Sequence, residues 1–314
     1  MKSKLEVEKT MSNKSIAKIP EPEQGLGFID VHCHLPFPRP KKNDRLPSDE
    51  EQYRVFFEKG GKFLITSTID MNTLKMTLHF LREHQKGFGF TCGWAPQTVT
   101  YTPERKYEKE WKEWKEYILA NEETYLAIGE IGLDFHHAKT LAKREKQIEE
   151  LQKIFELTEG LDKPYVLHVR NAASHELDKE NPKHRFNNDD GATKEILRIM
   201  DEFSIKPETV MFHCFSGPEQ YGRLLPTKGF FLSVPSSAYG FKRWRGATQH
   251  SPLGCLLTET DSYYQHPFKR GPVNVPANVQ YSIAAISYTH GVSQKVVSEK
   301  TIQNAIKFFN LSLS

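Results

Sequence analysis

Residues 28–34 read FIDVHCH, a short run of apolar and β-branched residues with polar side chains at alternate positions. Such a run is typical of a buried β-strand, bounded here by Gly27 on one side and a proline-rich stretch on the other. Side chains in a strand alternate between its two faces, so Asp30, His32 and His34 are expected to share one face. Three polar groups on one face of a buried strand need partners.

Seven further runs of this kind follow, separated by longer amphipathic or charged stretches. This alternation predicts repeated βα units around a parallel sheet, and therefore an α/β fold. Eight strands in roughly 285 residues match a closed (β/α)8 barrel, the TIM barrel, with an open doubly wound sheet as the alternative. The expected strands cover residues 28–34, 63–69, 88–94, 125–131, 165–169, 210–215, 230–234 and 256–261.

The composition is that of a globular protein, with 38% hydrophobic and 26% charged residues among 314. This balance excludes wholesale disorder and collagen-like repeats. The net charge of +3 is too small to attract a polyanion by bulk charge alone. No apolar run approaches the ~20 residues that cross a bilayer, and residues 1–18 lack the apolar region of a signal peptide, so we expect no membrane contact and a cytoplasmic location. Four cysteines without a CxxC pattern fit reduced thiols.

The domain organisation is expected to be simple. Residues 1–24 are charged, contain two prolines and lack an apolar period, which predicts a flexible tail before a single barrel domain at residues 25–314. Residues 36–50 and 174–191 are expected to be inserted loops that overhang an active site. One helix is expected to bury an aromatic stripe against the barrel instead of stacking bases; the stripe is Tyr107, Trp111, Trp114 and Ile118.

Residues of metal-ligand type recur near the ends of the expected strands. Active-site side chains of a barrel project from the carboxyl ends of its strands, and His34 lies where the first strand gives way to a loop. The side chains expected to converge on this mouth are His32, His34, Glu130, His168, His213 and Asp261. Four imidazoles and two carboxylates can hold two divalent ions, with one carboxylate bridging them. Zn²⁺, Mn²⁺, Fe²⁺ and Mg²⁺ all accept such mixed ligands, so the metal stays open.

The order of these motifs resembles the TatD family of metal-dependent deoxyribonucleases. The motifs are DxHxH, GEIGLD, HxR, HCFSG and ETDS, followed by Arg-Gly-Pro-x-Asn-x-Pro, and the resemblance extends over about residues 27–311. It implies a TIM barrel of the amidohydrolase-like superfamily that hydrolyses phosphodiester bonds in DNA, often as a 3′-to-5′ exonuclease.

The resemblance also implies roles for the six side chains. His32, His34 and Asp261 would serve one ion, His168 and His213 the other, and Glu130 would bridge the two. The catalytic residues would then be Asp261, which orients or deprotonates the attacking water, and the bridging Glu130.

Substrate contacts are expected from cationic and small polar residues near the same mouth. Arg170 lies two residues beyond His168, hence on the same face of its strand, and a guanidinium suits a phosphate because it binds two oxygens at once. The other expected substrate contacts are Ser216, Lys269 and Arg270. Glu259 and Asp134 are expected to hydrogen-bond metal ligands and hold them in place.

One position departs from the family pattern. Relatives commonly carry Gly-x-His-Pro at the end of the third strand, whereas this chain has GWAP at residues 93–96, with Ala95 in place of the histidine. Trp94 or a histidine on an overhanging loop would be the candidates to compensate, and His136 and His137 are expected at the rim of the site or below it. Alternatives to a DNase are action on RNA, an ester or amide hydrolase acting on another substrate such as aminoacyl-tRNA, and a non-catalytic barrel. The sequence does not define the oligomeric state, and a monomer is compatible with it.

Overall fold

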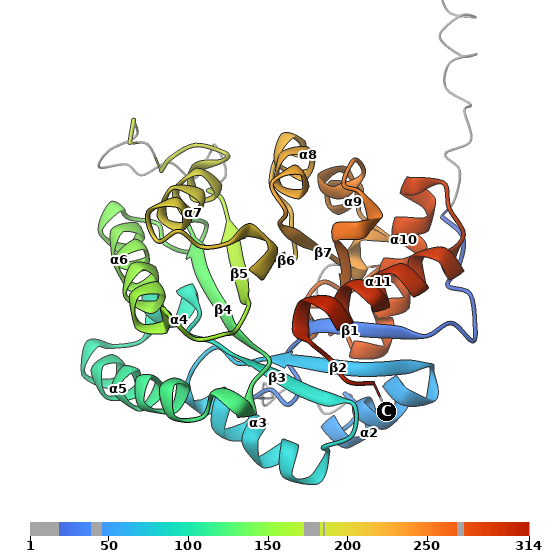
Figure 1. Cartoon of the computed structure of the whole chain (residues 1–314), viewed down its shortest axis with the longest axis horizontal. Helices are drawn as coiled ribbons and strands as arrows, with labels where there is room; N and C mark the ends of the chain where they lie inside the picture. Colours follow the sequence, from blue (N-terminus) through green and yellow to red (C-terminus); the bar gives the residue numbers. More distant parts are fainter. Residues whose placement is uncertain (1–18, 39–45, 173–182, 185, 269–272, 314) are drawn as a thin grey trace, which may run out of the picture.

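The computed structural model describes residues 19–38, 46–172, 183–184, 186–268 and 273–313. Its centre is a sheet of eight parallel strands in which each strand pairs with the next along the chain (Figure 1). The strands are β1 (Phe28–Cys33), β2 (Gly61–Ser67), β3 (Phe88–Cys92), β4 (Ala127–Asp134), β5 (Tyr165–Arg170), β6 (Val210–His213), β7 (Phe231–Pro235) and β8 (Leu256–Glu259).

The first and last strands meet and close the sheet. The Asp261 amide donates to the His32 carbonyl at 2.9 Å, and the His34 amide donates to the Ser262 carbonyl at 2.6 Å. The Thr258 hydroxyl adds a hydrogen bond of 2.9 Å to the Ile29 carbonyl. The predicted TIM barrel is confirmed, and the alternative of an open sheet is wrong.

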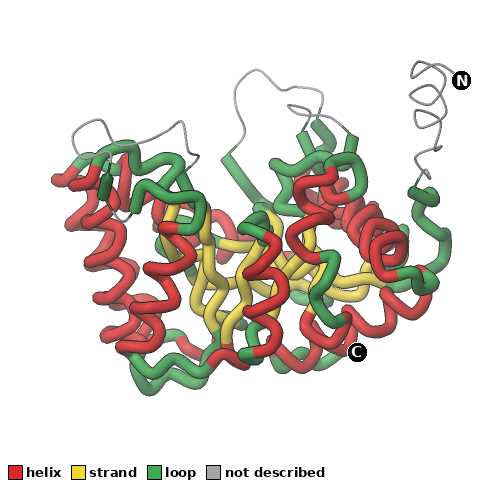
Figure 2. The backbone as a smooth tube through the Cα atoms, turned by 90° about the horizontal axis from the view of Figure 1, so that it is seen from above, coloured by secondary structure: helices red, strands yellow, loops and turns green. Residues whose placement is uncertain are grey.

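Helices surround the strands on the outside, as Figure 2 shows. They are α2 (Asp49–Glu58), α3 (Met71–Glu83), α4 (Pro96–Tyr101), α5 (Glu104–Ala120), α6 (Leu141–Thr158), α7 (Gly191–Glu202), α8 (Glu219–Thr227), α9 (Lys242–Thr248), α10 (Gln280–His290) and α11 (Gln294–Phe309). Several begin at capping side chains; the Asp70 carboxylate, for example, accepts from the Thr73 amide at 2.8 Å at the start of α3. No described helix is long and apolar enough to span a membrane.

The aromatic stripe of α5 is buried, as its helical spacing predicts. The Trp114 side chain has no exposed surface and stacks on Trp111, with their ring centroids 5.1 Å apart. Trp94 packs against both rings and joins the stripe. Burial of these large rings fixes α5 on the barrel.

An apolar layer lies below the polar residues in the barrel. Val166, Met211 and Leu257 each precede a polar side chain by two residues, so they lie on the same strand face as His168, His213 and Glu259. One or two apolar residues from most of the other strands join them, and Phe308 and Phe309 near the end of α11 pack on this cluster. The strands therefore carry an apolar layer toward their starts and a polar layer toward their carboxyl ends.

The described chain begins with a segment in contact with the barrel. The Tyr239 hydroxyl donates to the Ile19 carbonyl at 3.2 Å, and the Gln294 amide group bonds Glu21 and Glu23 at 2.9 Å each. These residues fall within the stretch expected to be a flexible tail, of which residues 1–18 lie outside the described chain. Residues 39–45, 174–182 and 185 of the two expected loops also lie outside it.

Candidate active site

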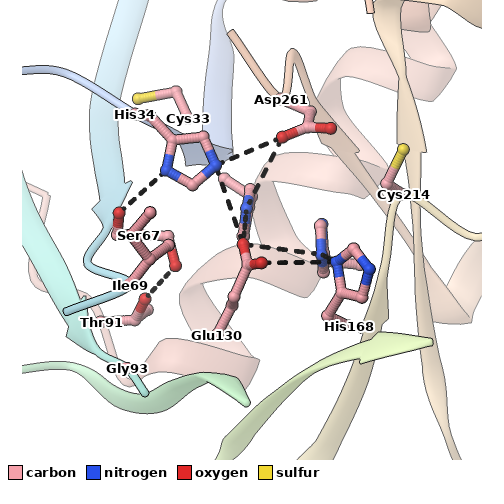
Figure 3. A network of polar contacts seen from close by, with 12 residues as sticks. Cys33, His34, Ser67, Ile69, Thr91, Gly93, Glu130, His168, Cys214 and Asp261 are labelled. Carbon is pink, nitrogen blue, oxygen red and sulfur yellow. Dashed lines mark hydrogen bonds and ion pairs between the residues drawn. The ribbon is translucent and has the colours of Figure 1, made fainter. Parts of the chain in front are cut away.

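Six side chains from five strands or strand ends meet at the carboxyl ends of the strands. They are the six expected from the sequence: His32, His34, Glu130, His168, His213 and Asp261. Figure 3 shows Glu130 at the centre of the group, with His34 and Asp261 on one side and His168 on the other. None of the six is an exposed residue, so their polar atoms need partners within the protein or a bound ion.

Glu130 uses both carboxylate oxygens in this cluster. Its Oε2 lies 3.2 Å from His32 Nε2 and 3.7 Å from His34 Nε2, and its Oε1 lies 3.4 Å from His168 Nδ1. Burial raises the pKa of Glu130, but the contacts with His168 and His32 outweigh burial and hold the pKa well below its usual range. The side chain is therefore an ionised carboxylate with an oxygen facing each half of the cluster.

Asp261 supplies the second carboxylate. Its Oδ1 lies 3.4 Å from His34 Nε2 and 3.9 Å from His32 Nε2. Burial raises the pKa of Asp261, but the hydrogen bond from His34 and the nearby imidazoles of His213 and His32 together outweigh it, so the net pKa is lowered. Two buried, ionised carboxylates in one cluster require compensating positive charge.

The imidazoles of His34 and His213 also face polar groups outside the six-residue cluster. His34 Nδ1 lies 3.0 Å from the Ser67 carbonyl, which only a protonated Nδ1 can satisfy, and Nε2 is the nitrogen that faces the carboxylates. His213 directs Nε2 toward His168 Nδ1 at 3.1 Å, while its Nδ1 lies 3.8 Å from Glu259 Oε1. Glu259 is fully buried and accepts a hydrogen bond of 2.5 Å from the Ser233 hydroxyl on its other oxygen. Glu259 thus lies beside His213, but its Oε1 makes no hydrogen bond within the described residues, so the expected hydrogen bond to a metal ligand stays a prediction.

Asp134 collects three donors on one oxygen. Its Oδ2 lies 3.0 Å from His168 Nε2, 2.9 Å from Gln97 Nε2 and 2.7 Å from His137 Nδ1. Burial raises the pKa of Asp134, but the bonds from His137 and His168 lower it by more, so the carboxylate stays ionised. For His168, burial lowers the pKa, whereas Asp134 and Glu130 raise it to a net value of about 10.

Asp30 does not join the cluster, although strict alternation places it on the same face as His32 and His34. Its carboxylate accepts from the Thr260 amide at 3.0 Å and from the Thr260 hydroxyl at 2.5 Å. The register of β1 against β2 shifts between Asp30 and Cys33, so strict alternation does not hold across this stretch. Asp30 instead ties the end of β8 to β1.

The cluster fits a divalent cation. Both ring nitrogens of His32 are buried and lack a hydrogen bond, an arrangement that costs free energy unless another partner satisfies them. The His32 ring stacks on that of His213, with the centroids 3.9 Å apart. Three groups have donor atoms within 4.8 Å of one another: His32, His34 and Glu130; Glu130, His168 and His213; and His32, His213 and Asp261. Imidazole nitrogens and carboxylate oxygens are ligands that divalent transition metals accept.

A cavity of about 380 Å³ opens over the cluster. Arg170 and Ser216, both expected to contact substrate, line its wall, whereas Lys269 and Arg270 lie outside the described residues. Within the described chain the Arg170 guanidinium has no hydrogen bond or ion pair, so it is available to an anion. A cavity of this size accepts a group as large as a small molecule.

Several other residues line this cavity without having been predicted as site residues, among them Gln97, Arg243 and Trp244. No motif marks Arg243 and Trp244 in the sequence, because they lie on a short helix whose position depends on packing. Gln97 becomes recognisable only through its contact with Asp134, a contact it shares with His137, which was expected at the rim of the site or below it.

The position of the missing histidine is filled by packing. Ala95 is fully buried, and Trp94 is 1% exposed, with its Nε1 donating to the Tyr107 hydroxyl at 3.2 Å. The idea that Trp94 compensates for the histidine is therefore wrong, because the indole is enclosed by the aromatic stripe of α5 and does not line the cavity. Gln97, two residues after Ala95, reaches the site instead, and His137 is the loop histidine at the cavity wall.

A TIM barrel with imidazoles and carboxylates gathered at the carboxyl ends of its strands has the site of an enzyme that binds divalent metal. Comparison with known proteins narrows the class. The family model described as TatD related DNase matches residues 29–310. The chain therefore belongs to the TatD family and is a hydrolase that acts on ester bonds.

Individual relatives agree with this assignment. The chain is 27% identical over 286 residues to an uncharacterized metal-dependent hydrolase of Methanocaldococcus jannaschii, covering 91% of this chain and 98% of that protein. It is 27% identical over 291 residues to deoxyribonuclease TATDN3 of Homo sapiens, covering 91% and 95% of the two chains.

Solved structures share the fold. A TatD homolog from Escherichia coli superposes with a TM-score of 0.70 at 21% identity, covering 91% of this chain and 98% of that chain. A TatD family hydrolase from Entamoeba histolytica gives a TM-score of 0.72 at 17% identity, covering 91% and 99%.

Proposed function

We propose that the protein is a deoxyribonuclease that removes nucleotides from a DNA end in the 3′-to-5′ direction with the help of two divalent cations. The observation that carries this proposal is the position of the Glu130 carboxylate between two sets of imidazoles, beside a cavity lined by Arg170, which has no ion pair within the described chain. A deoxyribonuclease among the relatives supports DNA as the substrate. The small volume of the cavity favours a chain end over a continuous duplex.

Two overlapping groups of ligands support a pair of ions. His32, His34 and Asp261 would hold one ion, and the contacts of Asp261 Oδ1 with both histidines support that grouping. His168 and His213 would hold the other, and Glu130 would bridge. When bound, such ions polarise the phosphoryl oxygens, lower the pKa of a water and stabilise the leaving oxygen.

Asp261 is the proposed general base. Both carboxylates line the cavity, but the Asp261 side chain is 12% exposed against 5% for Glu130, so water reaches Asp261 more readily. Its lowered pKa keeps it ionised and able to accept a proton from the attacking water. Glu130, enclosed by imidazoles, has the opposite task of fixing the two halves of the cluster relative to each other.

Arg170 is the proposed phosphate-binding residue. It follows His168 by two residues on β5, and its guanidinium at the cavity wall can donate two hydrogen bonds to one phosphate. Ser216, also on the wall, adds a hydroxyl donor. Lys269 and Arg270 are proposed to contact the substrate on the basis of their sequence position alone.

The cellular setting follows from simpler features. Four cysteines are unpaired, which supports a reducing compartment, and we place the protein in the cytoplasm. We expect a monomer, because the six residues of the cluster all come from one chain.

Metal analysis coupled to a nuclease assay tests the proposal. The purified protein is analysed for its metal content, chelated, and supplied in turn with Mn²⁺, Mg²⁺ and Zn²⁺ in the presence of single-stranded DNA labelled at either end. We expect chelation to stop the reaction, re-addition to restore it, and mononucleotides to leave from the 3′ end. A protein that binds none of these metals, or that binds them and leaves both labelled substrates intact, would contradict the proposal.

A further inference from the structure

One wall of the cavity belongs to α9, which contributes nothing to the carboxylate and imidazole cluster. Arg243 and Trp244 line the cavity from this helix. The Arg243 guanidinium lies over the Trp244 ring, 5.4 Å from its centroid, and has no hydrogen bond or ion pair among the described residues. An exposed guanidinium held by an indole is oriented for an anion without being neutralised by a carboxylate.

Trp244 differs from the other tryptophans of the chain. Trp94, Trp111 and Trp114 are at most 9% exposed and belong to the aromatic stripe, whereas Trp244 is only partly buried and presents its side chain to the cavity. Trp244 packs against the edge of the main hydrophobic core and is not enclosed by it. The cavity therefore contains an indole surface that the packing of the fold does not cover.

A second set of aromatic side chains lines the cavity near His34. The Phe37 and Tyr264 ring centroids are 6.5 Å apart, and both rings lie beside the His34 imidazole, at 5.6 and 6.2 Å. Tyr264 is 56% exposed although it is a large aromatic residue. Exposed aromatic surface gathered in a cavity marks a binding site more often than a packing defect.

We infer that Trp244 and Arg243, together with Phe37 and Tyr264, form a subsite for the nucleoside next to the scissile phosphate. The base would stack on an aromatic face, and Arg243 would bind the following phosphate. The inference rests on the proposed function and adds to it, because the cation cluster and Arg170 recognise only the phosphodiester group. Stacking suits this position because every nucleobase offers a flat face, whatever its sequence.

A binding experiment tests the subsite without the cations. Chelated protein is titrated with thymidine 3′,5′-bisphosphate and with the same compound lacking the base, by calorimetry and by tryptophan fluorescence. We expect the base to improve affinity by about tenfold or more. We also expect thymidine bisphosphate to quench the fluorescence, because Trp244 is the one tryptophan that lines the cavity.

Variants separate stacking from packing. Trp244→Leu should reduce the advantage of the base toward unity, and Trp244→Phe should restore most of it, because phenylalanine keeps an aromatic face. Arg243→Gln should weaken both probes by a similar factor, whereas Arg54→Gln on α2, which removes an exposed arginine paired with Glu58, is the charge-matched control and should weaken neither. Equal affinity of the wild-type protein for both probes, or no binding at millimolar concentration, would overturn the inference.

Catalysis then distinguishes this inference from the proposed function. The metal-loaded protein is assayed on the dinucleotide TpT and on analogues in which one base or the other is absent. We expect loss of one base to lower kcat/KM by about tenfold or more in the wild type and by much less in Trp244→Leu. Hydrolysis of TpT with no dependence on either base would reject the subsite and leave the phosphodiesterase intact. Base-dependent binding without hydrolysis would keep the nucleoside subsite and reject the phosphodiesterase.

Discussion

The Asp134 carboxylate offers a sensitive test of how the site holds its metal. Asp134→Asn preserves the shape of the side chain but replaces a charged acceptor of three donors, from His168, Gln97 and His137 at 2.7–3.0 Å, by a neutral amide. A hydrogen bond to a charged group contributes about 1.5–3 kcal/mol, against about 0.5–1.5 kcal/mol for a neutral pair. Only the carbonyl oxygen of the new amide can accept, so His168 also loses part of its orientation.

Loss of such support for a metal ligand typically costs about 10–100-fold in metal affinity. We therefore expect the dissociation constant of Asp134→Asn for Mn²⁺ or Zn²⁺ to rise by this factor, which equals about 1.4–2.7 kcal/mol. Competition with a chromophoric chelator measures it, and circular dichroism establishes that the variant is folded.

A matched control is available on the same protein. Asp190 is also a mostly buried carboxylate, which accepts from the Tyr221 hydroxyl at 3.2 Å and pairs with Lys194 at 3.0 Å, and it does not line the cavity. Asp190→Asn should leave the metal affinity unchanged. If folded Asp134→Asn binds metal as tightly as the wild type, the argument that this carboxylate positions His168 as a ligand is refuted.

Four further outcomes are expected. Asp261→Asn should lower kcat by about 10²–10⁴-fold in a folded protein, measured by single-turnover release of nucleotide, and a smaller loss would reject its role as the base. Arg170→Ala should raise KM for DNA at least tenfold, and Arg170→Lys should raise it less, because lysine restores the charge but not the paired hydrogen bonds of a guanidinium. A KM for Arg170→Ala equal to that of the wild type would exclude Arg170 from substrate binding. Metal at about 100 times its dissociation constant should stabilise the folded protein by about 2.7 kcal/mol, measured by thermal unfolding, and this stabilisation should be smaller in His32→Ala. If metal does not stabilise the wild type, the folded protein has no such metal site. Trp114→Ala should lower the free energy of unfolding in urea by about 3–5 kcal/mol while the metal affinity of the folded protein stays the same, and a change in that affinity would show that the stripe is coupled to the site.

Much of the candidate site was predictable from the sequence because of the barrel topology. Strand patterns place His34, Glu130, His168, His213 and Asp261 near strand ends, and parallel strands in a closed barrel bring those ends to one rim. The convergence therefore needs no knowledge of side-chain packing. The burial of the α5 stripe was predictable for a similar reason, since helical periodicity by itself defines the face that packs.

The tertiary structure alone decided which neighbours complete the site. A register shift in β1 directs Asp30 to Thr260, and the packing of Trp94 into the α5 stripe leaves Gln97 as the residue from that segment that reaches Asp134. The positions of Arg243 and Trp244 depend on how α9 docks after β7. Local periodicity specifies the face of an element on which a residue lies, but contacts between distant elements depend on register, helix docking and side-chain orientation, which are settled only when the whole barrel packs.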